Sequence, residues 1–503
     1  MFENQPKGLY ALALANTGER FGYYTMLAVF ALFLRANYGL TPGTAGVIYS
    51  SFLMFVYFFP LIGGFMADKF GFGKMVTTGI IIMFLGYLLL SVPLGGNTVA
   101  LVVMLVALLS IGLGTGLFKG NLQVMVGDLY NDPQYVDKRD AGFSIFYMAI
   151  NIGALFAPTA AIRIMEWAQQ NLGVSENDSY HFAFAVACAS LILSIAIYYA
   201  FRSTFRHVEG GVKKNGNQVE EDTLSPSETK ERLIALLLVF GVVAFFWMSF
   251  HQNGLSLTYF ANEYNETSAD GLKSMAFNVW NLVAIIIMVY SAFSLFQGKT
   301  SKSKVIAVVA VVAALAFLYY NYSHIDGAVE VKAPIFQQFN PFYVVALTPV
   351  SLSIFGWLAS RNKEPKAPRK IAYGMIVAAV AFCLMLYASL TLPSPVEQAN
   401  LGDAAPCASS YWLISTYLIL TFGELLLSPM GISFVSKVAP PKYKGACMGG
   451  WFVSTALGNQ LVMVGGLLWG ELPLWTVWAV FAGLCLLAST FMFLIMKRLE
   501  KVC

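Results

Sequence analysis

Long apolar runs separated by short polar breaks follow one another along almost the whole chain. A helix needs about 20 mainly apolar residues to cross the hydrocarbon core of a bilayer, and runs of that length recur throughout this sequence. The pattern predicts a polytopic α-helical membrane protein with fourteen spans. The spans are expected near residues 9–36, 45–67, 75–93, 98–122, 141–164, 180–201, 233–260, 274–297, 305–322, 335–358, 371–392, 410–436, 446–470 and 475–496.

One polar stretch, about residues 202–231, is much longer than the other breaks. It contains Gly, Lys, Asn, Glu and Ser residues, a composition typical of a cytoplasmic linker. Six predicted spans precede it and eight follow it. Because many transporters consist of two six-span halves around a central site, two of the eight later spans are expected to be additions.

Composition and charge agree with this pattern. Hydrophobic residues make up 58% of the 503 residues and charged residues 12%, and the mean hydropathy is +0.66, values typical of membrane proteins. Of the 31 Lys and Arg residues, 25 fall in segments on the side of the termini and four on the other side or at its edge. This bias predicts that both termini are cytoplasmic. No basic patch for nucleic acid is visible.

The first predicted span carries two opposite charges. A charged side chain at membrane depth costs about 2.5 to 3.5 kcal/mol, so it persists where it faces protein or a water-filled cavity. Helical spacing places four polar or aromatic side chains on one face: Asn16, Arg20, Tyr23 and Tyr24. Glu19 lies beside them. We expect this span to form one wall of a polar cavity.

Two further charges lie inside spans. Lys119 follows a glycine-rich run in the fourth span, and Glu424 lies in the middle of a span in the last third of the chain. An ion pair between Lys119 and Glu424 across a central cavity is the economical pairing. It would form a latch that protonation or a competing ligand charge releases. Two alternatives stay open: Lys119 could snorkel to the interface, and Glu424 could pair within its own half.

Other polar and aromatic residues inside spans are weaker candidates. They are Tyr57, Asn151, Trp247, His251, Gln252, Asn340 and Trp451. An isolated aromatic residue more often packs than contacts a ligand. His251 has two interpretations, a neutral hydrogen-bonded side chain or a proton carrier, because histidine titrates in the physiological range.

The connection between the second and third spans reads Gly64-x-x-x-Asp68-Lys69. It is a plain short loop in one interpretation. In this position it also resembles the signature loop of the major facilitator superfamily, a segment with a conformational role.

Six motifs together resemble one family more closely. They occur in the expected order over residues 9–495, and the Phe-Tyr-x-x-Ile-Asn-x-Gly element is the most specific. The chain thereby closely resembles the proton-dependent oligopeptide transporter (POT) family of the major facilitator superfamily. The motifs are Glu19-Arg20-Phe-Gly-Tyr23-Tyr24, Gly64-x-x-x-Asp68-Lys69, Phe146-Tyr147-Met-Ala-Ile150-Asn151-Ile152-Gly153, Phe246-Trp247, Gln337-x-x-Asn340-Pro341 and Gly423-Glu424-x-x-x-Ser428-Pro429.

The resemblance implies an all-α major facilitator fold of two six-helix bundles plus two extra helices. The extra pair is expected at 274–297 and 305–322, because the Trp247 helix directly follows the linker. The expected units are an N-terminal bundle (1–201), the linker (202–231), the first helix of the C-terminal bundle (232–272), the additional helices (273–325) and the remaining five helices (326–503).

The resemblance also implies a site for di- and tripeptides. Arg20 and Lys119 would face the peptide carboxylate, and Glu424 the amino group. Polar contacts would come from Tyr23, Tyr24, Tyr57, Asn151, Asn340 and Ser428, and side-chain pockets would be bordered by Trp247 and Trp451. The expected proton carriers are Glu19, Glu424 and His251. The chain departs from the family at Asn16 and His251, where acidic residues are usual.

These observations predict a proton-coupled secondary transporter that imports di- and tripeptides by alternating access. We expect a functional monomer in the plasma membrane that needs no metal or cofactor besides the proton as coupling ion. Alternatives are a carrier for an amino acid, nitrate or a peptide-like drug, and a peptide sensor that does not transport. An enzyme is disfavoured because the spans contain no zinc motif or Ser/His/Asp set.

Overall fold

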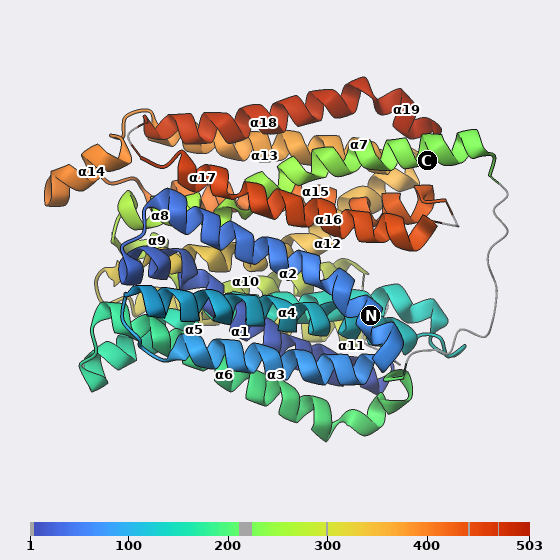
Figure 1. Cartoon of the computed structure of the whole chain (residues 1–503), viewed down its shortest axis with the longest axis horizontal. Coiled ribbons are helices and arrows are strands. Elements are labelled where there is room, and N and C mark those ends of the chain that lie inside the picture. The colour runs from blue at the N-terminus through green and yellow to red at the C-terminus, as the bar shows by residue number, and fades with distance from the viewer. Residues whose placement is uncertain (1–4, 211–223, 298–299, 441–442, 471, 503) are drawn as a thin grey trace.

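The computed structural model describes residues 5–210, 224–297, 300–440, 443–470 and 472–502, and its regular structure is mostly helical (Figure 1). The α-helices are α1 (Lys7–Tyr38), α2 (Pro42–Phe70), α3 (Phe72–Ser91), α4 (Thr98–Asp128), α5 (Arg139–Leu172), α6 (Glu176–Ala200), α7 (Pro226–Phe250), α8 (Ser256–Glu263), α9 (Gly271–Ser274), α10 (Val279–Gln297), α11 (Ser301–Ser323), α12 (Phe339–Ser360), α13 (Ala367–Ser389), α14 (Pro395–Leu401), α15 (Ser410–Val438), α16 (Lys444–Leu461), α17 (Met463–Leu467), α18 (Leu474–Leu494) and α19 (Met496–Lys501).

Short elements connect the long helices. The 3-10 helices are η1 (Val136–Lys138), η2 (Arg202–Thr204), η3 (Arg206–Val208), η4 (His251–Gly254), η5 (Met275–Phe277), η6 (Ala333–Gln338) and η7 (Gly402–Ala404). Two short strands, β1 (Ser268–Ala269) and β2 (Val329–Glu330), form an antiparallel pair.

The long helices form two bundles with an additional pair. In the N-terminal bundle, α1 packs against α5 and α6, and α4 against α2 and α3. In the C-terminal bundle, α13 packs against α15 and α18, and α7 against α16 and α18. The bundles meet where α2 contacts α16 and α17 and where α5 contacts α12. The additional helices α10 and α11 pack on each other, and α10 also contacts α12. The predicted arrangement of two bundles and two extra helices is confirmed.

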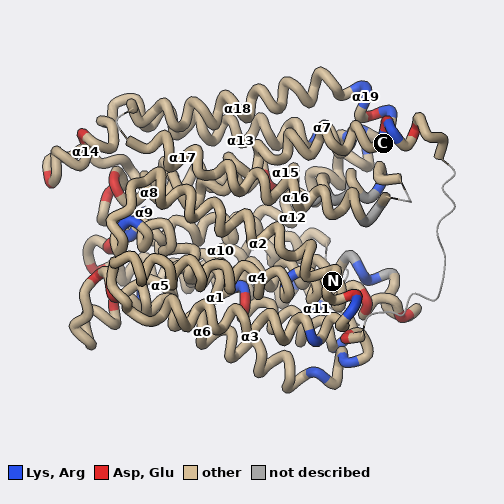
Figure 2. The backbone as a smooth tube through the Cα atoms, in the orientation of Figure 1, with Lys and Arg blue, Asp and Glu red and all other residues tan. Residues whose placement is uncertain are grey.

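Each predicted span corresponds to helical structure. Within the described part of the chain, 12 helical segments are long and apolar enough to cross a membrane. The other two predicted spans fall on α1, which carries Glu19 and Arg20, and on α16, which is rich in small and polar residues. Figure 2 shows that the chain begins and ends at the same end of the molecule, where many Lys and Arg residues lie. That this end faces the cytoplasm stays a prediction.

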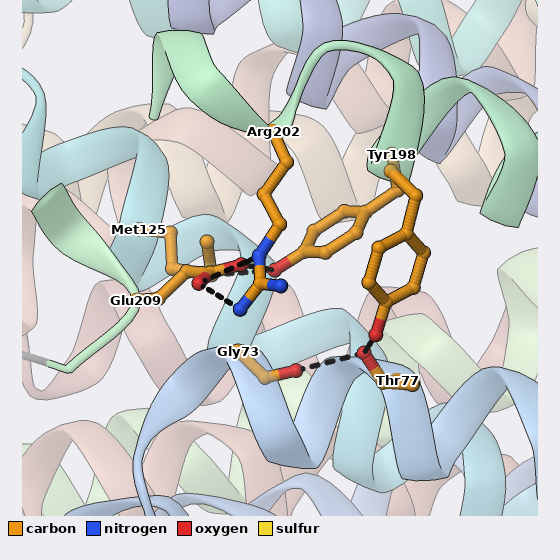
Figure 3. A network of polar contacts seen from close by, with 7 residues as sticks. Gly73, Thr77, Met125, Tyr198, Arg202 and Glu209 are labelled. Atoms are coloured by element: carbon orange, nitrogen blue, oxygen red, sulfur yellow. Dashed lines mark hydrogen bonds and ion pairs between the residues drawn. The ribbon is translucent and has the colours of Figure 1, made fainter. Parts of the chain in front are cut away.

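The beginning of the predicted linker is fixed to the N-terminal bundle (Figure 3). The Glu209 carboxylate accepts hydrogen bonds from the Tyr198 hydroxyl at 3.0 Å and from the Arg202 guanidinium, Nη2 to Oε2, at 2.7 Å. The backbone N–H of Gly73, at the start of α3, donates to the carbonyl of Glu209 at 3.0 Å. Hydrogen bonds from Arg202 to Glu209 raise the pKa of this arginine.

The predicted end of the linker, residue 231, is wrong. Residues 211–223 lie outside the described residues, but residues 226–231, expected in the linker, already belong to α7. The reason is local: the side chains of Ser225 and Glu228 form a capping box, and Pro226 occupies the first helical turn.

The seventh predicted span is broken in its last third, between α7 and α8. The side-chain amide of Gln252 donates to the carbonyls of Met248 at 3.1 Å and Val462 at 3.0 Å. Val462 lies at a second break, between α16 and α17. Because lipid offers no hydrogen bonds, such breaks persist only where protein groups satisfy the freed backbone. One glutamine therefore supports the backbone at both breaks.

The two bundles contact each other closely at the end opposite the termini. Arg35 on α1 forms an ion pair with Glu263 on α8, and the Trp469 indole N–H donates to Glu263 at 2.9 Å. Nearby, α2 and α17 approach so closely that a Cβ added at Gly466 would lie 2.5 Å from the carbonyl oxygen of Pro42. Only glycine fits this contact between backbones.

We expect Gly466→Ala to weaken the contact between the bundles by about 1 to 3 kcal/mol, because the added methyl group meets backbone rather than a movable side chain. The measurement is the midpoint of thermal unfolding in detergent, which should fall. Gly483→Ala is the matched control, since a Cβ at Gly483 meets nothing within 4 Å. Equal midpoints for both variants would contradict the prediction.

Candidate functional site

Two opposite charges lie side by side near the middle of α1. The Arg20 guanidinium donates two hydrogen bonds to the Glu19 carboxylate, each 2.5 Å long, and the side chains are 3% and 1% exposed. The Arg20 Cζ lies 4.5 Å from the ring centroid of Tyr23, which packs edge-on against Tyr24. Asn16 is buried one turn earlier. The charges neutralise each other, which removes much of the cost of placing either at membrane depth.

Lys119 has a different kind of partner. Its ammonium on α4 lies 4.2 Å from the ring centroid of Tyr57 on α2, a cation–π contact worth about 2 kcal/mol when desolvated. No ion pair within the described part of the chain includes Lys119. The face of a tyrosine ring therefore occupies the place expected for a carboxylate.

Glu424 is held within the C-terminal bundle. This carboxylate on α15 is 8% exposed, and the Asn340 amide on α12 donates to its Oε2 at 2.9 Å and to the Thr421 hydroxyl at 3.0 Å. The predicted ion pair between Lys119 and Glu424 is therefore wrong for this conformation. Each charge instead has a neutral partner within its own bundle, which agrees with the alternative stated for Glu424.

Groups of the N-terminal bundle nevertheless surround Glu424. Tyr24, Tyr57 and Tyr147, on α1, α2 and α5, lie close enough to interact electrostatically with its carboxylate. Glu424 of the C-terminal bundle and these three tyrosines of the N-terminal bundle are thus within electrostatic range of one another.

His251 lies at the break between α7 and α8. Its ring stacks on Trp247, with centroids 5.3 Å apart and planes at 22°, and lies 6.2 Å from the Tyr57 ring. Its Nδ1 is 2.6 Å from Oδ1 of Asn459 on α16. The buried Trp247 indole N–H has no hydrogen-bond partner among the residues the structure describes.

Three other predicted residues have contacts that involve none of these charges. Trp451 is 4% exposed and packs against Phe240 and directly over Gly431, where a Cβ would clash with its ring. The Asn151 amide donates to the Tyr147 carbonyl within α5 at 3.0 Å. Ser428 lies one turn beyond Glu424 and is partly buried.

Two polar residues of the site are not predicted from the sequence. Thr421 lies three residues before Glu424, and Asn459 lies eight residues after Trp451. Both are fully buried. A polar side chain on the same helical face as a candidate residue is the signal that could have found them.

The loop predicted after the second span is also wrong, because its residues are helical. Gly64, Asp68 and Lys69 lie within α2, which ends at Phe70, and α3 begins at Phe72. The connection is reduced to Gly71, whose φ of +91° only glycine adopts readily. Asp68 and Lys69 are exposed in the last turn of α2.

A family model described as the POT family matches residues 73–224 and 317–465. The chain belongs to the POT family. It is 29% identical over 487 residues to a transporter called YclF from Bacillus subtilis, covering 92% of this chain and 87% of that protein. It is 26% identical over 477 residues to dipeptide and tripeptide permease A of Escherichia coli, covering 92% and 83%.

A solved structure of a peptide transporter POT in complex with sulfate has the same fold. Its TM-score is 0.75 at 22% identity, with 100% of this chain and 96% of that chain covered. Of the two positions where the sequence is expected to depart from the family pattern, Asn16 is buried on α1 and His251 lies 6.2 Å from the Tyr57 ring of the other bundle.

We expect Glu19→Gln to destabilise the protein by about 3 to 5 kcal/mol, because it leaves the buried Arg20 guanidinium without its counter-charge. The double variant Glu19→Gln/Arg20→Gln should recover part of this loss, since no unpaired charge remains. Thermal unfolding in detergent measures both. A double variant less stable than the single variant would contradict the pairing as the source of the cost.

Proposed function

We propose that this protein imports di- and tripeptides across the plasma membrane by alternating access, driven by protons that move inward. The observation that carries the proposal is the distribution of charge: cations on the N-terminal bundle and a carboxylate on the C-terminal bundle face one region. A peptide zwitterion carries opposite charges a few ångströms apart and needs both. Family membership and the printed names of the relatives support the same substrate class.

The peptide carboxylate would bind Lys119 and Arg20. Lys119 is available, because only the Tyr57 ring covers its ammonium. Arg20 is occupied by Glu19, so a peptide carboxylate and the Glu19 carboxylate compete for one guanidinium. A proton on Glu19 weakens the internal pair and releases Arg20. Proton binding and peptide binding then favour each other.

The peptide amino group would bind Glu424. The carboxylate is already held by Asn340, which fixes its position before the ligand arrives. Polar contacts to the peptide backbone come in this proposal from Tyr23, Tyr24, Tyr57, Asn151, Asn340 and Ser428. The unpartnered indole N–H of Trp247 is a further donor, and Trp451 borders the side-chain region.

The proton gradient supplies enough energy for this work. One charge moving across 100 mV is worth about 2.3 kcal/mol, which corresponds to accumulation of tens-fold. Glu19, Glu424 and His251 are the proposed proton carriers. A single chain provides every group of the site, which supports a functional monomer, although a tetrameric structure is known for a protein of the same fold with 20% identity.

We expect liposomes containing the purified protein to accumulate labelled dialanine when the outside is acidic and the inside negative. Dissipating the gradient should stop accumulation and leave exchange of dialanine intact. Accumulation indifferent to both gradients would exclude proton coupling. Competition by an amino acid or nitrate but not by dipeptides would indicate another substrate, and binding without exchange would indicate a sensor.

We expect Glu424→Gln to weaken dialanine binding about 10- to 100-fold, because the loss of a charged hydrogen bond costs about 1.5 to 3 kcal/mol. The amide oxygen can still accept from Asn340, so the fold should be retained. The measurement is competition by dialanine in the exchange assay. Glu397→Gln is the matched control, since Glu397 lies in the capping box of α14, where glutamine also functions. Equal affinities in both variants would contradict the assigned role.

A further inference from the structure

A chain of hydrogen bonds runs from His251 across the interface between the bundles. His251 at the end of α7 contacts Asn459 on α16, with 2.6 Å between Nδ1 and Oδ1. The Asn459 amide nitrogen donates to the backbone carbonyl of Leu53 on α2 at 3.4 Å. Asn459 is 0% exposed. These hydrogen bonds therefore join three helices and both bundles through the fully buried Asn459, while His251 is partly buried.

The direction of each hydrogen bond in this chain is determined. A backbone carbonyl can only accept, so the Leu53 oxygen requires the NH₂ side of the Asn459 amide. The amide oxygen then faces His251, and it can only accept as well. The hydrogen between them must belong to Nδ1 of the imidazole. In the neutral ring, Nε2 is consequently the nitrogen with the free lone pair.

We propose that Asn459 is a positioning residue for proton coupling, which holds His251 as the Nδ1–H tautomer so that Nε2 receives the coupling proton. This inference rests on the proposed function and deepens it. Asn459 is the hydrogen-bond partner of the ring among the residues that the structure describes, so without it the neutral ring could place its hydrogen on either nitrogen.

The groups that face His251 determine what a proton on Nε2 would interact with. The Lys119 ammonium of α4 interacts electrostatically with the ring, and the Tyr57 ring of α2 is near both groups, 4.2 Å from the ammonium and 6.2 Å from the imidazole. On its own helix, His251 has only aromatic neighbours, Trp247 and Phe250, within stacking or edge contact. A proton on Nε2 thus creates a second cation near Lys119. A peptide carboxylate at Lys119 would relieve this repulsion, which links proton binding to peptide binding.

The contact with Leu53 makes the tautomer depend on conformation. Leu53 belongs to α2 and Asn459 to α16, helices of different bundles that pack together here. If alternating access separates α2 from α16 at this level, the Asn459 amide loses the carbonyl that orients it. Its amide can then rotate, and the proton on Nδ1 is no longer selected. The neutral tautomer would thereby differ between the two states of the transport cycle.

A direct test is nuclear magnetic resonance of the full-length protein with ¹³C,¹⁵N-labelled histidine in lipid. The chain has four histidines, so the signals of His251 are assigned by their loss in His251→Ala. At a pH where the ring is neutral, the wild type should show the proton on Nδ1. Asn459→Ala should show a mixture or the Nε2–H form. Nε2–H in the wild type would overturn the proposal.

Transport provides the second readout. We expect Asn459→Asp to shift the midpoint of the pH profile of dialanine exchange by about one pH unit or more toward higher pH, because a carboxylate at hydrogen-bond distance stabilises the imidazolium. The shift should vanish when His251→Ala is combined with Asn459→Asp. Asn281→Ala is the matched control, because it removes another buried amide, paired with Asn321 in the additional helices, and should leave the midpoint unchanged.

The two experiments separate the two proposals. An Nδ1-bound proton that depends on Asn459 supports the positioning role even if dialanine is not carried, and wild-type protein without proton-driven uptake overturns only the proposed function. A shift in Asn459→Asp that persists without His251 would overturn the positioning role.

Discussion

The bidentate pair of Glu19 and Arg20 is the interaction around which the polar region between the bundles is arranged. Because these adjacent charges cancel, the middle of α1 contributes no net charge to this region. Lys119 and Glu424 then remain as single charges, and each is held by a neutral partner in its own bundle, Tyr57 or Asn340. Among the described residues, ion pairs that join the bundles lie at the end away from the termini: Arg35 with Glu263 and Lys332 with Glu166.

The sequence was sufficient to predict the helices and the residues that meet between them, because long apolar runs and charges inside them are strong signals. It was insufficient to predict how the charges pair. Successive residues of a helix point about 100° apart, so helical spacing placed Glu19 beside Arg20 without specifying a bidentate pair. In the structure the long arginine side chain reaches back to the Glu19 carboxylate. The predicted Lys119–Glu424 pair was wrong because the prediction considered only charged partners. In the structure Lys119 contacts the face of the Tyr57 ring, and Glu424 accepts from the Asn340 amide.

The interrupted helices are a second feature that the sequence pattern did not predict. Residues 233–260 read as one continuous apolar span, yet the helix is interrupted at His251–Gly254. Gln252 stabilises the interruption by bonding to Val462, which is 210 residues away in the chain. A local pattern cannot contain that information, because the partner is known only once α7 and α16 pack together. The unusual backbone at His251, and with it the contact to Asn459, follows from the tertiary fold.

Neutral partners at the centre suit a site that must bind and release a ligand. Breaking a buried ion pair costs about 3 to 5 kcal/mol, whereas a hydrogen bond to a charged group contributes about 1.5 to 3 kcal/mol and a desolvated cation–π contact about 2 kcal/mol. A zwitterion that displaces the Tyr57 ring from Lys119 and binds Glu424 beside Asn340 therefore breaks no ion pair at these two charges. The single strong pair it must open, Glu19 with Arg20, is the one that a proton can weaken. This difference in strength makes proton binding the step on which access to Arg20 depends.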